Sequence, residues 1–266
     1  MPDVEIIFQR DENIALLLIY NPCLRNALSK ALLVQLRARL EELSQDERIG
    51  AVIIGSAVGG FFASGGNIGE LRALGGATAG LRFAQLAQAT FKTVEQFPRP
   101  VLAAINGVCL GAGLELALSA DIRIAAHSAV LASPQLGLGI LPGLGGGQRL
   151  IRLCGAGRAR RHILSGDRIS AEEAEALGLV ERVVPASELW KTARETAKRL
   201  ANKSKVATGL AKKALNYSSQ ARLETGCAHE ATLFGLACSA ANCSALRPPP
   251  ERDGVPVLSR NELQCR

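Results

Sequence analysis

A single charged side chain lies within a long apolar stretch of the chain. Residues 103–120 read AAINGVCLGAGLELALSA, and Glu115 is their only charged residue. Burial in such surroundings raises the pKa of a carboxyl group toward the range that suits proton transfer. The Gly-Ala-Gly step at residues 111–113 predicts a helix start, whose free N–H groups attract negative charge. We therefore interpret Glu115 as a general acid or base; the alternative is a helix-start carboxylate stabilised by the helix dipole.

A second glycine-rich junction offers backbone donors of the same kind. The segment FFASGGNIGEL at residues 61–71 places Ser64, Gly65 and Gly66 ahead of a predicted short helix. Small residues let a ligand approach the backbone closely. N–H groups from this junction and from residues 111–113 that converge on one oxygen would form an oxyanion hole, which stabilises an enolate or a tetrahedral anion. The alternative is that both junctions are structural turns, and the sequence leaves this choice open.

Other motifs of catalysis or ligand binding are missing. The glycines of GLGGG at residues 143–147 fit neither a P-loop nor a dinucleotide-binding pattern, so we interpret them as a turn into a helix. The three histidines do not cluster in sequence, and no Gly-x-Ser-x-Gly elbow occurs. Seven scattered cysteines without a Cys-x-x-Cys pair predict reduced thiols. We expect no metal site and no disulfide framework.

The elements expected around these residues alternate between strands and helices. Strands are predicted at residues 4–8, 14–20, 51–55, 101–105, 122–125, 130–132 and 180–184. Helices are predicted after an N-cap at Ser29, at residues 68–74 and 81–96, from residue 111, and at 148–154, 156–165, 171–177, 187–202, 205–218 and 223–240. This order predicts repeated ββα units and an α/β fold.

The same pattern divides the chain into three parts. We expect an α/β core at residues 1–185 and a helical region at residues 186–240. Residues 241–266 are rich in Cys, Arg and Pro and have no helical period, so we expect an atypical, poorly ordered tail.

Composition and charge limit the class of protein and its partners. A chain of 266 residues with 48% hydrophobic and 21% charged residues can bury a large core. Aromatic residues are scarce at 4%, which argues against a stacking surface for single-stranded nucleic acid. The formal net charge of +7 is accounted for by solubility alone; the alternatives are an anionic ligand, such as a phosphate-bearing cofactor, and RNA. DNA is not expected as a partner.

The ends and the apolar runs of the sequence bear on its location. The N-terminus enters directly into strand-like sequence without a signal-peptide pattern, and no apolar run favours a membrane span. We therefore expect no membrane partner. The predicted location is the bacterial cytoplasm, or an organelle matrix after removal of a targeting segment that is not present here.

Four segments together resemble the crotonase (enoyl-CoA hydratase/isomerase) superfamily. They are FFASGGNIGEL, AAINGVCLGAGLELALSADIRIA, SPQLGLGILPGLGGGQRL and SGDRISAEEAEALGLVERVV, in the family's order and spacing. The resemblance covers residues 4–240. It implies a spiral core of ββα units, a helical C-terminal region that forms a homotrimer or a dimer of trimers, and acyl-CoA substrates. It implies no permanently bound cofactor; coenzyme A is the carrier of the substrate's acyl group.

The resemblance also implies roles for single residues. Gly66 and Ala112 match the two positions whose backbone N–H groups form the oxyanion hole for the thioester oxygen. Glu115 matches the first of two catalytic glutamates, and Gly143 matches a position that lines the catalytic water or the acyl group. Contacts with coenzyme A are implied for six residues: Cys23, Leu24, Arg25, Ser64, Asn67 and Ile68.

Position 135 departs from the family pattern. The second catalytic glutamate of the hydratases falls there, and this chain has Gln135. Hydration needs a base that activates water and an acid that protonates the α-carbon, and two carboxylates share these tasks. An amide can orient water or substrate through hydrogen bonds but cannot exchange a proton. The alternative is that Gln135 is a polar loop residue after Pro134 with no part in a reaction.

The expected function is that of an acyl-CoA enzyme, closest to an enoyl-CoA hydratase, which adds water to a 2-enoyl-CoA through an enolate. Other reactions of the same fold stay open: decarboxylation, C–C hydrolysis and double-bond isomerisation. A homologue without catalysis that binds acyl-CoA or RNA is a further alternative. The tail after residue 240 lacks the family's usual acidic turn and basic, aromatic ending, so we expect weaker coenzyme A binding or weaker trimers than is typical.

Overall fold

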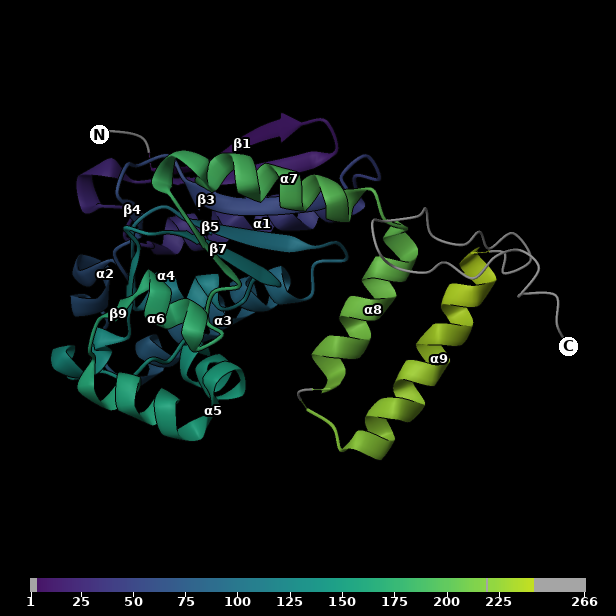
Figure 1. Cartoon of the computed structure of the whole chain (residues 1–266). Coiled ribbons are helices and arrows are strands. Elements are labelled where there is room, and N and C mark those ends of the chain that lie inside the picture. Colours follow the sequence, from purple (N-terminus) through teal and green to yellow (C-terminus); the bar gives the residue numbers. More distant parts are fainter. Residues whose placement is uncertain (1–3, 219, 242–266) are drawn as a thin grey trace, which may run out of the picture.

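A six-stranded sheet forms the centre of the molecule (Figure 1). The computed structural model describes residues 4–218 and 220–241. The strands of this sheet, in spatial order, are β1 (Glu5–Asp11), β2 (Ile14–Tyr20), β3 (Ala51–Ser56), β5 (Val101–Ile105), β7 (Ile122–Ala126) and β10 (Arg182–Val184). β1 and β2 form an antiparallel hairpin, and every later pairing is parallel. The prediction of an α/β fold is confirmed.

Helices cover both faces of this sheet. Along β2 the side chains alternate: Ala15, Leu17 and Ile19 join one core, while Ile14, Leu16 and Leu18 join the other. The first core is closed by α1 (Lys30–Gln45) and α3 (Ala77–Glu95), and the second by α7 (Leu189–Ala201). Burial on both faces explains why these strands read as continuous apolar runs. It also places α7 with the sheet, although the division of the chain at residue 185 stays a prediction.

A second, smaller sheet carries both glycine-rich junctions. It contains β4 (Phe61–Ala63), β6 (Val108–Leu110), β8 (Val130–Ala132) and β9 (Ile169–Ser170) in that order. β4, β6 and β8 run parallel, so their carboxyl ends lie at one edge. The first junction follows β4 and leads into α2 (Ile68–Arg72); the second follows β6 and leads into α4 (Ala112–Ala117). The residues after β8 include Gln135, in the short 3-10 helix η2 (Pro134–Leu138).

Several helix boundaries agree with the sequence and some differ. The side chain of Ser29 accepts a hydrogen bond from the Leu32 N–H at 3.2 Å, which confirms the predicted N-cap of α1. α3 begins at Ala77, four residues before its predicted start. α5 (Gly146–Ser165) contains a non-helical residue at Gly155, where two separate helices are predicted to meet. α6 (Ala171–Ala176) then precedes β10.

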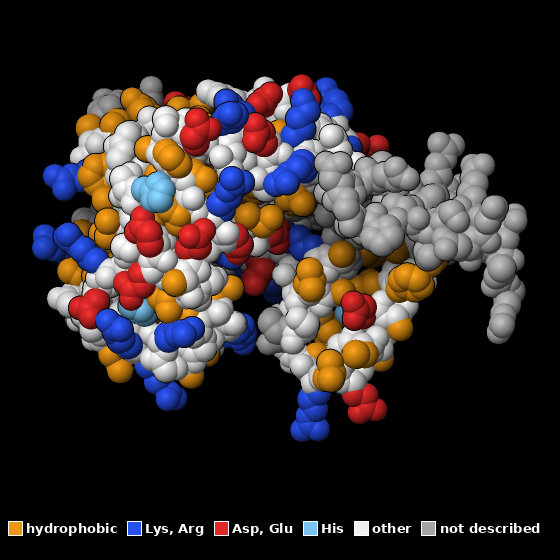
Figure 2. Space-filling view, viewed as in Figure 1, with side chains coloured by type: hydrophobic (Ala, Val, Ile, Leu, Met, Phe, Trp, Pro, Cys, Tyr) orange, Lys and Arg blue, Asp and Glu red, His pale blue; other side chains and the backbone are white. Residues whose placement is uncertain are grey.

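The last two helices form an arm beside this body. α8 (Lys205–Ser218) and α9 (Leu223–Ala241) run side by side and project away from the sheets (Figure 1). Hydrophobic side chains gather on the visible face of the arm (Figure 2), and Leu215, Leu223, Phe234 and Leu236 are all exposed. In the described part of the chain, every helix is too short or too polar to cross a membrane. The tail predicted after residue 240 lies outside the described residues, apart from the final residue of α9.

Candidate active site

A cavity of about 590 Å³ lies at the edge where β4, β6 and β8 end. Seven of the predicted site residues line it: Ser64, Gly66, Ile68, Ala112, Glu115, Gln135 and Gly143. Much of the remaining wall is aliphatic and is formed by Leu71, Leu74, Leu81, Leu138, Ile140 and Leu141. An apolar cavity with a few convergent polar groups is typical of a site for a small molecule.

Glu115 is the buried carboxylate of this cavity, with 3% of its surface exposed. Its Oε1 atom accepts hydrogen bonds from the N–H groups of Leu144 at 2.9 Å and Gly146 at 2.8 Å. Its Oε2 atom accepts one from Nε2 of Gln135 at 3.1 Å. Burial raises the pKa of Glu115, while these three hydrogen bonds and the charge of Arg149 act in the opposite direction. The donors belong to residues outside α4, so the carboxylate is satisfied by other segments and not by the start of its own helix.

The glycines at residues 143–147 therefore do more than turn the chain. The peptide N–H groups of this loop and of the first turn of α5 receive the Glu115 carboxylate. A side chain at Gly146 would overlap Cγ of Glu115 and lie 2.9 Å from its Cδ. Sequence reasoning missed these donors because a backbone N–H leaves no trace in residue type. The run of glycines was the available signal, and its partner lies about 30 residues away.

Gln135 is held between two polar groups. The hydroxyl of Ser133 donates to its Oε1 atom at 2.8 Å, which turns its Nε2 atom toward Glu115. The side chain of Gln135 is buried. Its segment forms the 3-10 helix η2, where the sequence alone predicts no more than a loop. An amide in this place can fix the carboxylate of Glu115 through a hydrogen bond. Because position 135 carries no carboxyl group, Glu115 is the one acidic residue among the described residues that line the cavity.

The two glycine-rich junctions lie next to each other. Leu28 forms a parallel bridge with Gly66, using the carbonyl of Gly65 and the N–H of Asn67, so the N–H of Gly66 points to the opposite side. Ala112 is the first residue of α4, and its N–H therefore has no acceptor within that helix. A Cβ atom built on Gly66 would lie 3.9 Å from Cβ of Ala112. The two residues are thus neighbours, as an oxyanion hole formed by their N–H groups would require.

Close packing of α4 on β4 accounts for this arrangement. A side chain at Gly113 would lie 2.6 Å from the carbonyl oxygen of Ala63. Only a glycine lets the helix approach the strand so closely, and the helix start is thereby drawn to the first junction.

The residues predicted to contact coenzyme A divide into two groups. Ser64 and Ile68 line the cavity. Leu24 and Arg25 are hydrogen-bonded to Ser64: its hydroxyl donates to the Leu24 carbonyl at 3.0 Å, and its N–H donates to the Arg25 carbonyl at 3.2 Å.

The remaining two of these residues stand apart from the cavity wall. Cys23 is exposed in the 3-10 helix η1 (Pro22–Leu24). The side chain of Asn67 caps α2 by accepting from the Glu70 N–H at 3.3 Å. Asn67 therefore has a structural role as the cap of α2. The contacts of all six residues with coenzyme A stay predictions.

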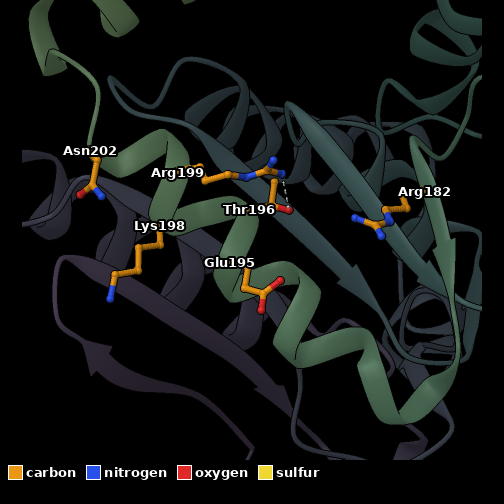
Figure 3. Close-up of a pocket in the computed structure, with 6 residues that line it drawn as sticks. All are labelled: Arg182, Glu195, Thr196, Lys198, Arg199 and Asn202. Atoms are coloured by element: carbon orange, nitrogen blue, oxygen red, sulfur yellow. Dashed lines mark hydrogen bonds between the residues drawn. The ribbon is translucent and has the colours of Figure 1, made fainter. Parts of the chain in front are cut away.

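A second cavity, of about 500 Å³, is formed by residues in and next to α7 together with Arg182 of β10 (Figure 3). It is lined by Arg182, Glu195, Thr196, Lys198, Arg199 and Asn202, none of which is a predicted site residue. Two of its cations already have partners: Lys198 pairs with Glu12 at 2.9 Å, and Arg199 donates to Thr196 at 3.4 Å. Among residues 4–218 and 220–241, no cluster of three His, Cys, Asp or Glu residues could hold a metal ion.

Comparison with known proteins places this chain in a family. The family model described as Enoyl-CoA hydratase/isomerase matches residues 9–245. The short-chain-enoyl-CoA hydratase of Clostridium acetobutylicum is 38% identical over 230 residues, which are 86% of this chain and 88% of that protein. The 2,3-dehydroadipyl-CoA hydratase of Escherichia coli is 39% identical over 234 residues, 87% and 89% of the two chains.

Solved structures agree with the sequence matches. The crystal structure of an enoyl-CoA hydratase from Bacillus anthracis superposes with a TM-score of 0.83 at 36% identity, and the match covers 90% of this chain and 96% of that one. The expected resemblance in fold is confirmed. With a family model that spans most of its length and relatives near 38% identity, the chain belongs to the enoyl-CoA hydratase/isomerase family.

Proposed function

We propose that this chain adds water to the double bond of a 2-enoyl-CoA, with Glu115 as its acid and base. The observation that carries the proposal is the position of one buried carboxylate, held by three hydrogen bonds, in the same cavity wall as the N–H groups of Gly66 and Ala112. The names of the hydratase relatives support the same reaction class.

The proposed reaction uses these groups in turn. The N–H groups of Gly66 and Ala112 donate to the thioester oxygen and stabilise the negative charge that grows on it. Ionised Glu115 takes a proton from water, whose oxygen forms a bond to the β-carbon and leaves an enolate. Glu115 then returns that proton to the α-carbon, so one carboxylate serves both steps. Gln135 holds Oε2 of Glu115 and orients the water.

Replacement of Glu115 tests the assignment directly. Glu115→Gln should lower kcat for crotonyl-CoA by about 10³-fold, because an amide cannot transfer the proton. Binding of the saturated acyl-CoA, measured by calorimetry, should persist. The matched control is Glu41→Gln, an exposed residue paired with Arg37 on α1. Full turnover by Glu115→Gln would exclude Glu115 as the acid and base.

Replacement of Gln135 tests the meaning of the missing second glutamate. If an amide at position 135 limits hydration, Gln135→Glu should raise kcat about tenfold or more, since a second carboxylate could share the proton transfers. No gain in hydratase rate would exclude this position as the limit.

Other reactions of the family and a binding role make different predictions. A panel of acyl-CoA substrates followed by mass spectrometry separates hydration from decarboxylation, C–C cleavage and isomerisation by the product masses and fragments. Salt-sensitive RNA binding without turnover would favour a homologue that binds and does not catalyse.

We further propose a homotrimer or a dimer of trimers through the exposed apolar residues of α8 and α9, which sedimentation would test. The location, in a bacterial cytoplasm or an organelle matrix, stays a prediction.

A further inference from the structure

The guanidinium of Arg149 lies directly behind the loop that holds Glu115. Arg149 is in the first turn of α5, and its Nη1 atom is 2.6 Å from the place a Cβ would take at Gly145. Gly145 is the residue between the two N–H donors to Oε1 of Glu115. Arg149 therefore packs against the peptide that positions the carboxylate, at a residue whose φ of +98° favours glycine.

The charge of Arg149 is only partly matched by hydrogen bonds. Its Nη2 atom donates to Oε2 of Glu95, near the end of α3, at 3.0 Å. Its Nε and Nη1 atoms are buried and have no hydrogen-bond partner in the described part of the protein. A guanidinium stays protonated throughout the range in which proteins are folded. A positive charge that is partly shielded from water is thus paired with the carboxylate of Glu95 and acts electrostatically on that of Glu115.

Arg149 is the charged residue that acts on Glu115 in the described part of the chain, and the other arginines of α5 (Arg152, Arg158, Arg160 and Arg161) are exposed. α4 packs against β4, β6 and α5, and η2 supplies Gln135. β4 has no titratable side chain, and β6 has only Cys109, whose pKa burial raises, so the thiol stays neutral. Glu95 in turn is near Lys212 of α8, whose ammonium interacts with it electrostatically.

We propose that Arg149, held in place by Glu95, is a positioning residue that keeps Glu115 ionised and fixes the loop that binds its carboxylate. This inference rests on the proposed role of Glu115 as a base. Arg149 lies behind the cavity wall and is absent from its lining, so it acts through Glu115 and the loop. Loss of the positive charge would favour the protonated carboxyl, and loss of the negative charge of Glu95 would favour the carboxylate.

The test therefore uses two variants with opposite expected signs. In Arg149→Met the acid limb of the kcat/KM profile for crotonyl-CoA should move upward by about one pH unit, and Arg149→Lys should restore part of the shift. In Glu95→Gln the same limb should move downward by a few tenths of a unit or more. A purely structural disturbance would move the acid limb in the same direction in Arg149→Met and in Glu95→Gln. The matched control is Arg152→Met, an exposed arginine of the same helix that donates to the Gln148 carbonyl.

A second readout does not depend on turnover. The carboxyl carbon of Glu115, identified by its loss in Glu115→Gln, is titrated by NMR in protein labelled at glutamate. A shift of its titration midpoint upward in Arg149→Met and downward in Glu95→Gln supports the inference, even if no substrate is turned over and the proposed function fails. An unchanged midpoint in both folded variants would overturn it. If Arg149→Met does not fold, Glu95→Gln and Arg149→Lys decide the question.

Discussion

The cavity around Glu115 and the α8–α9 arm are built on opposite principles. In the cavity, glycines leave room for backbone and functional groups to come together. Gly113 allows α4 to pack closely on β4, and Gly146 leaves space for the side chain of Glu115. In the arm, long helices keep most of their apolar side chains exposed. A site made of close contacts tolerates almost no displacement, whereas an exposed arm depends on a few anchors.

The main anchor of the arm is an ion pair between the buried Lys212 and the partly buried Asp121. Lys212 of α8 donates to Asp121 at 2.6 Å and to the carbonyl oxygens of Val94 and Arg99 at 3.3 Å. Asp121 also accepts from the N–H of Val101 at 2.7 Å. Burial lowers the pKa of Lys212 and raises that of Asp121, and each charge offsets this effect on the other. The arm is thus attached to the body through polar groups at a few points. The wall of the cavity, by contrast, is held in place by packing along its whole length.

The largest effect should follow from crowding the cavity. Gly146→Ala places a methyl group against the side chain of Glu115 and must displace the carboxylate, so kcat/KM should fall about 100-fold or more. Steady-state kinetics with crotonyl-CoA measures this loss. The matched control is Gly157→Ala, where nothing lies within 4 Å of the added atom. Equal rates for the two variants would contradict the view that close contact fixes the site.

The next effect should follow from removing the anchor of the arm. Lys212→Met leaves the partly buried Asp121 carboxylate without its cation, which should cost about 2 kcal/mol of stability. Hydrogen exchange should show α8 opening first, while the fluorescence of Trp190, the only tryptophan, reports the core around α7.

The companion variants make this test specific. Adding Asp121→Asn should recover part of the loss, because the uncompensated charge is removed. Lys213→Met, at the exposed neighbouring position, should change neither readout. If α8 and the core lose protection together in Lys212→Met, the arm is not a separately anchored region.

A smaller effect separates stability from catalysis at Glu115. Because burial raises its pKa, the native state binds this proton more tightly than the unfolded chain. Stability should therefore fall as the pH rises from the ordinary glutamate value, about 4.3, through the raised value. Glu115→Gln removes this loss and should be more stable than the wild type by about 1 kcal/mol at pH 8.

Below pH 4 the two proteins should converge, because the wild-type carboxyl is then protonated in both states. The side chain of Gln135 can rotate to accept from the new amide, with Ser133 accepting in turn. Urea unfolding at pH 4 and pH 8 measures the difference, with Glu41→Gln as the control. A gap that is no wider at pH 8 than at pH 4 would count against the burial argument.

The smallest effect concerns the cap of α2. Asn67→Ala removes the acceptor for the Glu70 N–H and should destabilise this short helix by up to about 1 kcal/mol. If Asn67→Ala also raises KM for the acyl-CoA, and does so only by disturbing the cap, then Asn67→Ser, which keeps a capping oxygen, should restore both stability and KM. A KM that stays high in Asn67→Ser would show that Asn67 contacts the ligand itself.

Long, regular elements were predictable from the sequence; among the short strands β8 was predicted at its observed bounds, whereas β4, β6 and β9 were not. β2, β3 and β5 are continuous apolar runs, and α1 shows an apolar face behind a capping serine, so each was expected close to its observed bounds. β4, β6 and β9 have only two or three residues, too few for any period to show. These short strands nevertheless place both glycine-rich junctions at one edge.

The candidate site divides in the same way. Glu115 was predictable because a charge in an apolar stretch is unusual, and Gln135 because it departs from a family pattern. The donors at Leu144 and Gly146 act through peptide groups, and Arg149 acts from behind a loop. Their contributions depend on distances between segments that only the folded chain defines.

The lack of a side chain at residue 146 has a consequence for descent. With Glu115 in place, a larger residue at 146 has no room, so the glycine and the glutamate constrain each other's replacement. A descendant that loses the carboxylate frees position 146 to vary, and a lineage that changes the glycine first must abandon the acid with it.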